Sequence, residues 1–120
     1  IIDLGDFKRI NDLYGHSTGD EVLKLTASII SRVIRSSDSV GRYGGDEFIV
    51  LLPGASTSQA ASILERINGE ILEHQPIYIS IPIMADFGIA SCPNDAPSLL
   101  EAINIADEHM YNNKRQRKGL

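Results

Sequence analysis

The stretch 42–48, which reads Arg-Tyr-Gly-Gly-Asp-Glu-Phe, constrains the fold of this chain more than any other. Residues 39–43 before the glycines and 48–52 after them are rich in β-forming side chains. Two adjacent glycines between such runs indicate a short hairpin, because glycine accepts positive φ without a Cβ clash. We therefore expect Gly44 and Gly45 at the turn, and the rest of the chain can be placed around this ribbon.

Two carboxylates, Asp46 and Glu47, follow the glycines directly. Backbone without side chains lets a large anionic ligand approach the tip of a rigid ribbon, and two acids at that place suggest a divalent ion and a phosphate. The alternative is a solvated hairpin with two surface acids, which is the commoner reading of an isolated Gly-Gly-Asp-Glu. The hairpin by itself leaves both readings open.

Composition indicates one compact domain. The chain has 120 residues, of which 42% are hydrophobic, enough for a single core but not for two. The net charge of -5 offers no basic surface to a nucleic-acid backbone, and no apolar run approaches the roughly 20 residues of a membrane span. We expect neither nucleic-acid nor membrane contact for this domain. The single Cys92 cannot form an internal disulfide, which favours a reducing cytoplasm.

Hydrophobic periodicity predicts strands alternating with helices. The expected order is a strand at 1–4, helices at 6–13 and 17–35, hairpin strands at 39–43 and 48–52, a helix at 56–75, strands at 77–81 and 83–91, and a helix from 98 onwards. Predicted N-caps are Asp6, Ser17, Ser56 and Ser98. The chain starts within the first strand and without a methionine, so we interpret it as a segment of a longer protein. The fold class is α+β, a largely antiparallel sheet flanked by helices.

Three groups of residues carry a resemblance to a known family. They are the run from Asp3 to Asp20 with its Asn-Asp-x-Tyr-Gly-His-x-x-Gly-Asp core, the run 42–48, and the last helix with Ala106-Asp107, Tyr111 and Lys114. In order and spacing they resemble the GGDEF domain of diguanylate cyclases nearly end to end. The resemblance implies that residues 1–120 are one GGDEF domain that lacks its N-terminal beginning. It also implies a ferredoxin-like nucleotidyl cyclase core.

The resemblance implies a reaction and a metal. Two GTP molecules would condense to cyclic di-GMP with release of pyrophosphate, in a bacterial signalling protein that acts as a homodimer. Asp3, the Leu4 carbonyl and Asp46 resemble the family's ligands for Mg2+ or Mn2+, ions that prefer oxygen ligands. Catalytic roles fall to Asp46, to Glu47 at the ribose or the 3′-hydroxyl, and to Lys8.

The resemblance also implies substrate contacts. Asn11 and Asp20 would read the guanine edge, since an amide and a carboxylate complement its acceptors and donors. Gly44, Gly45, Lys114 and Lys118 would contact the triphosphate, while Arg115 and Arg117 are expected to be solvated. The alternatives are that Asn11 caps a helix, that Asp20 complements a helix dipole, and that the lysines form a solvated helix end.

Arg35 and Asp38 resemble the family's inhibitory product site, in which cyclic di-GMP binds away from the catalytic centre, and Arg66 would add a second guanidinium. The alternative for Arg35 and Asp38 is a surface salt bridge. We therefore expect GTP as substrate and cyclic di-GMP as both product and inhibitor.

Four positions depart from the family pattern. Gly5 stands where the family usually has a second acid, Asp86 where it usually has serine, and Arg117 where glycine is common; Lys118 replaces a common arginine more conservatively. An auxiliary carboxylate has thus been lost or displaced. These departures keep a second functional class open beside the cyclase, namely a weakly active or inactive module that binds GTP or cyclic di-GMP and regulates an attached domain.

Overall fold

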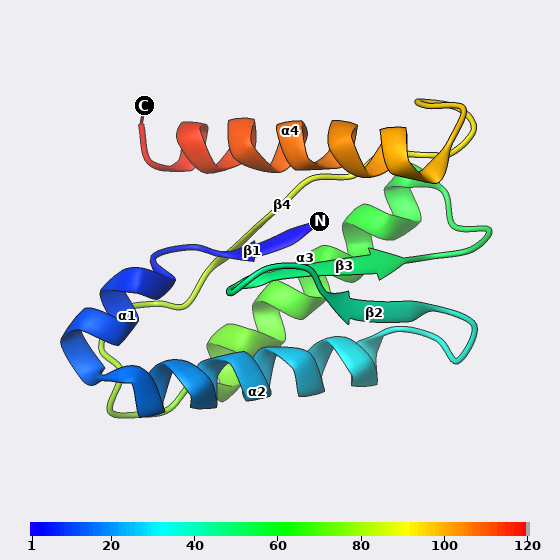
Figure 1. The fold of residues 1–120 in the computed structure, drawn as a ribbon. Helices are drawn as coiled ribbons and strands as arrows, with labels where there is room; N and C mark the ends of the chain where they lie inside the picture. Colours follow the sequence, from blue (N-terminus) through cyan, green and yellow to red (C-terminus); the bar gives the residue numbers. More distant parts are fainter. Residues whose placement is uncertain (120) are drawn as a thin grey trace.

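The computed structural model describes residues 1–119 as an antiparallel sheet with helices on both faces (Figure 1). The strands are β1 (Ile2–Leu4), β2 (Ser39–Arg42), β3 (Glu47–Leu51) and β4 (Ala85–Phe87). The helices are α1 (Phe7–Tyr14), α2 (His16–Val33), α3 (Thr57–His74) and α4 (Leu99–Arg117). The strand order is β2-β3-β1-β4, and every neighbouring pair is antiparallel. The predicted fold class is confirmed.

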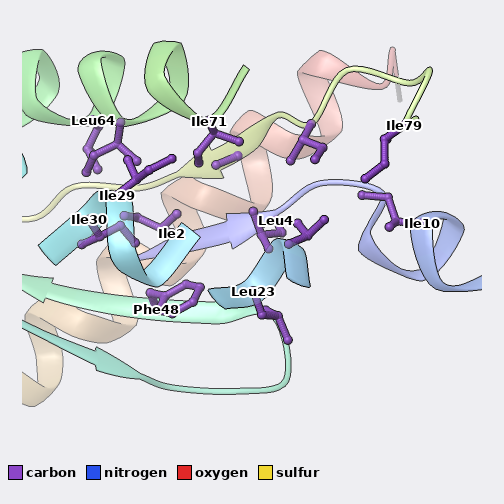
Figure 2. Packing of buried hydrophobic residues seen from close by; sticks show 14 residues of the cluster. Ile2, Leu4, Ile10, Leu23, Ile29, Ile30, Phe48, Leu64, Ile71 and Ile79 are labelled. Atoms are coloured by element: carbon purple, nitrogen blue, oxygen red, sulfur yellow. The ribbon is translucent and has the colours of Figure 1, made fainter. Parts of the chain in front are cut away.

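The side chains of the central strand β1 pack into two layers, one on each face of the sheet. Its side chains alternate between faces with the period of two that a strand imposes. Ile2 and Leu4 point into the main core, where they meet residues of helices α1, α2 and α3, of strand β3 and of the segment after α3 (Figure 2). Ile1 packs on the opposite side in a smaller cluster with Ala106 and Met110 of α4. Asp3 shares that second side, which α4 covers in Figure 1.

Two helices begin at the side-chain caps that the sequence predicts. At α3 the Ser56 hydroxyl accepts from the Gln59 amide at 3.1 Å, and the Gln59 side chain accepts from the Ser56 amide at 2.8 Å. The predicted buried stripe of α3, Ala60, Leu64, Ile67 and Ile71, is confirmed. At α4 the Ser98 hydroxyl accepts from the Glu101 amide at 3.3 Å. Local side-chain chemistry therefore determines both helix starts.

The caps predicted at Asp6 and Ser17 are wrong. Asp6 precedes α1 with a left-handed backbone (φ 60°) and makes no side-chain cap. Helix α2 begins at His16, after Gly15 at φ 93°, so Ser17 already lies within the helix. The Gly15 amide closes α1 by donating to the Asn11 carbonyl at 2.8 Å. The direct helix-to-helix turn needs this glycine, and it leaves no side chain in the capping position.

The buried stripes of α2 and α4 were predicted only in part. Val22 and Ile29 of α2 are buried, but Leu25 and Val33 are half-buried, and Leu23, Thr26 and Ile30 are buried as well. In α4, Ala106 and Met110 are buried while Leu99 is half exposed. The differences follow from which neighbouring element each helix meets, which periodicity alone does not specify.

The strand predicted at 77–81 is wrong, and the one at 83–91 is reduced to β4. The side chain of Gln75 takes the hydrogen bonds that a strand partner would supply. Its Nε2 donates to the carbonyls of Ile79 and Ile81, each at 3.1 Å, and its Oε1 accepts from the Ile83 amide at 2.8 Å. Asn68 likewise bonds both backbone groups of Ala85. Side-chain amides thus replace a sheet ladder, a substitution that alternation of apolar residues cannot reveal.

The hairpin tip spans residues 43–46 between β2 and β3, as predicted, but neither Gly44 nor Gly45 lies at positive φ. Instead the Arg42 side chain holds the tip, donating from Nε to the Gly44 carbonyl at 3.2 Å and from Nη2 to the Gly45 carbonyl at 2.6 Å. A Cβ at either glycine would meet no close contact, so the tip requires glycine neither for a left-handed turn nor to avoid a collision within the fold. No helix within residues 1–119 has the length and apolar character needed to cross a membrane.

Candidate active site

Three carboxylates meet at one end of the sheet. Asp3 lies in β1, Glu47 is the first residue of β3, and Asp46 directly precedes it. Asp3 and Glu47 are paired across the strands, and the Leu4 amide donates to the Asp46 carbonyl at 3.1 Å. One oxygen from each carboxylate lies within 4.8 Å of the others. The hairpin therefore carries its two acids to the middle strand, where both are half-buried.

The sheet register extends this cluster into a row of acids. Asp3 of β1 is opposite Glu47 of β3 on one side and opposite Asp86 of β4 on the other. Residues directly opposite one another project from the same face of a sheet, here the face covered by α4. Like charges in such a row repel one another, so the arrangement requires positive charge nearby.

Helix α4 supplies that positive charge at a spacing of one turn. The Lys114 ammonium donates to Asp3 Oδ2 at 2.9 Å. Arg117, three residues later, donates from Nε to Asp86 Oδ1 at 2.7 Å and from Nη2 to Asp86 Oδ2 at 2.9 Å. Residues three apart lie on one helix face, so the two bases match two acids of the row. The close approach of α4 to β4 depends on Gly88, where a Cβ would collide with the backbone of Ala106.

Burial and charge crowding change the protonation of the cluster. Burial raises the pKa of Asp3, the bonded Lys114 opposes this, and the neighbouring Asp46 charge adds to the rise. The pKa of Glu47 is raised by burial first and by the Asp3 charge second. Its bond to Asp3 raises the pKa of Lys114, which keeps the ammonium charged. Asp3 and Glu47 are thus carboxylates whose ionised forms lack sufficient positive charge around them.

The residues fit a divalent cation. Three convergent carboxylates with two raised pKa values form a set of oxygen ligands that a hard ion would neutralise. Beside them is a cavity of about 530 Å³, lined by Asp3, Glu47, Lys114 and residues of α4 including Asp107, Glu108 and Tyr111. A larger hollow of about 650 Å³ has a mixed polar and apolar lining that includes none of the three carboxylates.

The residues predicted to read guanine lie together between α1 and α2. The Asn11 side chain lies against Gly19, where a Cβ would collide with the Asn11 amide oxygen. Asp20, the next residue, is exposed on α2. The glycine therefore leaves room for the Asn11 side chain against α2, one residue before Asp20.

The predicted phosphate contacts lie on α4, on α1 and at the hairpin tip. Lys114 lies in the carboxylate site, while Lys118 lies 3.6 Å from Asp6 at the end of α4. Lys8 is exposed on the first turn of α1, and Gly44 and Gly45 form the hairpin tip. Asp6 and Lys118 bring the end of α4 to the start of α1.

The prediction that Arg117 is solvated is wrong. Its guanidinium forms the two-bond pair with Asp86, whose side chain is only 4% exposed. Arg115, in contrast, is exposed and lies over the Tyr111 ring at 5.8 Å, as expected for a surface residue. The sequence signal for the pair lies in the two departures at positions 86 and 117, which are 31 residues apart and give no local sign that they meet. Only the fold brings them together.

Arg35 and Asp38 form a closed ion pair after α2. Arg35 donates from Nε and Nη2 to the two carboxylate oxygens at 3.1 and 2.9 Å, and its amide donates to Asp38 Oδ2 at 2.8 Å. These bonds lower the pKa of Asp38. A further bond from Nη2 to the Pro53 carbonyl, 2.9 Å, ties the pair to the end of the hairpin. Arg66 is exposed on α3, a separate element.

The fold and the site define an α+β domain that carries a carboxylate cluster at one end of a helix-covered antiparallel sheet. The chain belongs to the GGDEF family, because the family model described as "Diguanylate cyclase, GGDEF domain" matches residues 1–119.

Known relatives agree with this assignment. Diguanylate cyclase A of Treponema denticola is 38% identical over 121 residues, which cover 99% of this chain and 33% of the relative. The solved GGDEF domain of a Pseudomonas aeruginosa protein named TpbB or YfiN is 41% identical, with a TM-score of 0.86 over 96% of this chain and 69% of that one. The GGDEF domain of DgcB from Caulobacter crescentus, solved in complex with c-di-GMP, is 32% identical and has a TM-score of 0.83. The match covers 96% of this chain and 70% of that one. The chain thus spans about a third of that curated relative's length.

Proposed function

We propose that this domain condenses two GTP molecules into cyclic di-GMP. The observation that carries the proposal is the convergence of Asp3, Asp46 and Glu47 beside a charged lysine. In each half-reaction the 3′-oxygen of one nucleotide forms a bond to the α-phosphorus of the other. The bond from that phosphorus to the pyrophosphate oxygen breaks, pyrophosphate leaves, and the hydroxyl proton passes to a base. Two such steps close the ring.

Each group in the site has a separate task in this proposal. Asp3, Asp46 and the Leu4 carbonyl would hold Mg2+ or Mn2+, which neutralises phosphate charge when bound. Glu47 either orients the ribose or accepts the 3′ proton, and its raised pKa suits proton acceptance. Lys114 keeps its charge through its raised pKa and stabilises the charge on the departing pyrophosphate. Lys8, Lys118 and the open tip at Gly44 and Gly45 receive the rest of the triphosphate.

Guanine selection is assigned to Asn11 and Asp20. The approach of Asn11 to Gly19, the residue before Asp20, supports this assignment, because guanine offers an adjacent N–H pair to a carboxylate and acceptors to an amide. Replacing each with alanine should reduce the preference for GTP over ATP more than it reduces triphosphate affinity. Calorimetry with both nucleotides measures this preference, and unchanged discrimination in both variants contradicts the assignment.

One chain offers one such site, so joining two nucleotides requires two sites that face each other. We therefore infer a homodimer as the catalytic form, within a longer bacterial signalling protein. Product inhibition is assigned to the Arg35–Asp38 pair, in which the Arg35 fork would transfer from Asp38 to cyclic di-GMP. Arg66 is the third proposed contact. Loss of cyclic di-GMP binding in Arg35→Ala, with GTP binding retained, is the expected result; full retention contradicts the assignment.

The alternative function is a regulatory module that binds GTP or cyclic di-GMP without turnover. Gly5 favours it, since an acid is missing beside the proposed metal ligands.

Incubating the protein with GTP and Mg2+ and measuring cyclic di-GMP by chromatography separates the two functions. Asp46→Ala should abolish turnover and weaken Mg2+-dependent GTP binding, whereas Glu65→Ala, at an exposed acid of α3, serves as the matched control. Wild-type-like turnover by a folded Asp46→Ala protein refutes the metal assignment.

A further inference from the structure

The guanidinium of Arg117 is held in one orientation beside the candidate active site. Nε and Nη2 bind the two oxygens of Asp86, and the Asp86 side chain is almost completely buried in the sheet. Two parallel bonds fix the plane of a guanidinium, so this long side chain is already ordered before any ligand arrives. Arg117 itself remains 30% exposed, which leaves part of its charge facing solvent.

Gly5 provides the space for this guanidinium. A Cβ at position 5 would collide with Arg117 Nη2 and would lie 3.0 Å from Asp86 Oδ2 and 3.1 Å from the Met84 carbonyl. The departures from the family pattern at positions 5, 86 and 117 are therefore one physical arrangement. It places a fixed cation directly on the backbone next to Leu4, whose carbonyl is a proposed metal ligand.

The remaining guanidinium nitrogen faces a loosely held anion. Arg117 Nη1 lies 3.9 Å from Asp6 Oδ2, and Lys118 Nζ lies 3.6 Å from Asp6 Oδ1. Both distances exceed those of hydrogen bonds. Asp6 is 41% exposed and does not cap α1, so no other described contact fixes its carboxylate between the two cations. A phosphate group has more charge and more acceptor oxygens than a carboxylate, and it suits the same pair of cations better.

We propose that Arg117 is a further binding residue for the triphosphate of the substrate, with Asp86 as its positioning residue. Arg117 Nη1 and Lys118 receive a phosphate group in place of Asp6. The Arg117 guanidinium neutralises phosphate charge directly. An acid at position 5 would contribute to this neutralisation only by holding a metal ion. Because the pair with Asp86 orders Arg117 beforehand, little side-chain freedom is lost on binding. This inference rests on the proposed GTP site.

Calorimetry with GTP and with GMP, both in the presence of Mg2+, tests the proposal. The variants are Arg117→Ala and the double variant Asp86→Ser/Arg117→Ala, which leaves no buried carboxylate without a partner. Both should bind GTP roughly tenfold more weakly, the loss of one charged hydrogen bond, and bind GMP with nearly wild-type affinity. Arg115→Ala, at the exposed neighbouring arginine, should bind both nucleotides as the wild type does.

Wild-type GTP affinity in the double variant overturns the proposal and makes Arg117 a structural residue, while leaving the cyclase function standing. Equal weakening for GTP and GMP also overturns it, because the effect would not depend on the outer phosphates. Failure of the wild type to bind GTP would instead refute the proposed function and this inference with it. A second cycle uses Gly5→Ala, whose Cβ should displace Arg117: GTP affinity should fall, and adding Arg117→Ala should cause little further loss.

Discussion

Helix α4 makes two ion pairs with the row of acids on the sheet, and they differ in kind. Lys114 gives Asp3 one bond from a flexible ammonium, next to two further carboxylates and a cavity. Arg117 gives Asp86 two bonds from a planar fork, for which Gly5 leaves the room. Asp3 keeps one oxygen free of Lys114, so a metal ion can take the place of the lysine. Asp86 has both carboxylate oxygens bonded to Arg117. One sheet face therefore combines a metal-accepting end, at Asp3, with a fixed ion pair, at Asp86.

Removing the acid at the accepting end should have the largest effect, and on activity. Asp3→Asn should lower the rate of cyclic di-GMP formation by roughly a hundredfold to a thousandfold, because a charge-stabilising ligand is lost from the reacting phosphates. The free energy of unfolding should change by less than about 1 kcal/mol, since the raised pKa of Asp3 shows that its charge is poorly accommodated by the fold. Turnover assays and urea denaturation measure the two quantities, with Asp12→Asn on the exposed side of α1 as control. An equal loss of stability and activity would contradict the assignment.

At the fixed pair of Arg117 and Asp86 the main effect on the protein without ligand should be on stability. Arg117→Ala leaves the buried Asp86 carboxylate without its partner, which should cost about 3 kcal/mol of unfolding free energy. The double variant Asp86→Ser/Arg117→Ala should cost less than about 1 kcal/mol, because neither charge remains. Urea denaturation of the wild type, of Arg117→Ala, of Asp86→Ser and of the double variant gives the coupling between the residues. Additive single and double effects would show that the two residues do not act as one pair.

Lys114→Arg tests whether the Lys114–Asp3 and Arg117–Asp86 pairs differ because one base is a lysine and the other an arginine. A planar fork at position 114 should bind both oxygens of Asp3 as Arg117 binds Asp86, so the metal must compete with two bonds instead of one. We expect turnover to fall by about tenfold at low Mg2+ and to recover as Mg2+ is raised. Titrating the rate with Mg2+ measures this shift. An unchanged Mg2+ requirement would show that Lys114 does not hold Asp3 against the metal.

The smallest effect concerns pH. Folding raises the pKa values of Asp3 and Glu47. At a pH between the unfolded and the folded pKa of each group, the folded protein therefore binds more protons than the unfolded chain. Without metal, their contribution to stability is fully present below the unfolded pKa values and is lost as pH rises through the folded ones. Unfolding measured from pH 3.8 upwards should show this decline, and Glu47→Gln should make it shallower. Mg2+ should remove it by stabilising the ionised forms; a slope that Mg2+ does not alter would contradict this origin.

Much of this structure follows from local chemistry in the sequence. The hairpin, the capping box at Ser56 and the buried stripe of α3 depend on residues close together in the chain, and each was predicted. The strand predicted at 77–81 failed because Gln75 supplies its backbone partners from outside the segment. Apolar alternation reports which residues are buried but not which groups satisfy the backbone.

The sequence alone determined which residue types form the site and how they are grouped. Two acids directly after a Gly-Gly turn, and Asp3 at the end of a strand, can be recognised from the residues next to them in the chain. Only the tertiary structure decided which charges meet. Register across three strands aligns Glu47, Asp3 and Asp86, and the packing of α4 over Gly88 brings bases to two of them from 111 and 31 residues away. Such pairings depend on the summed packing of all the elements between them, so no local pattern contains them.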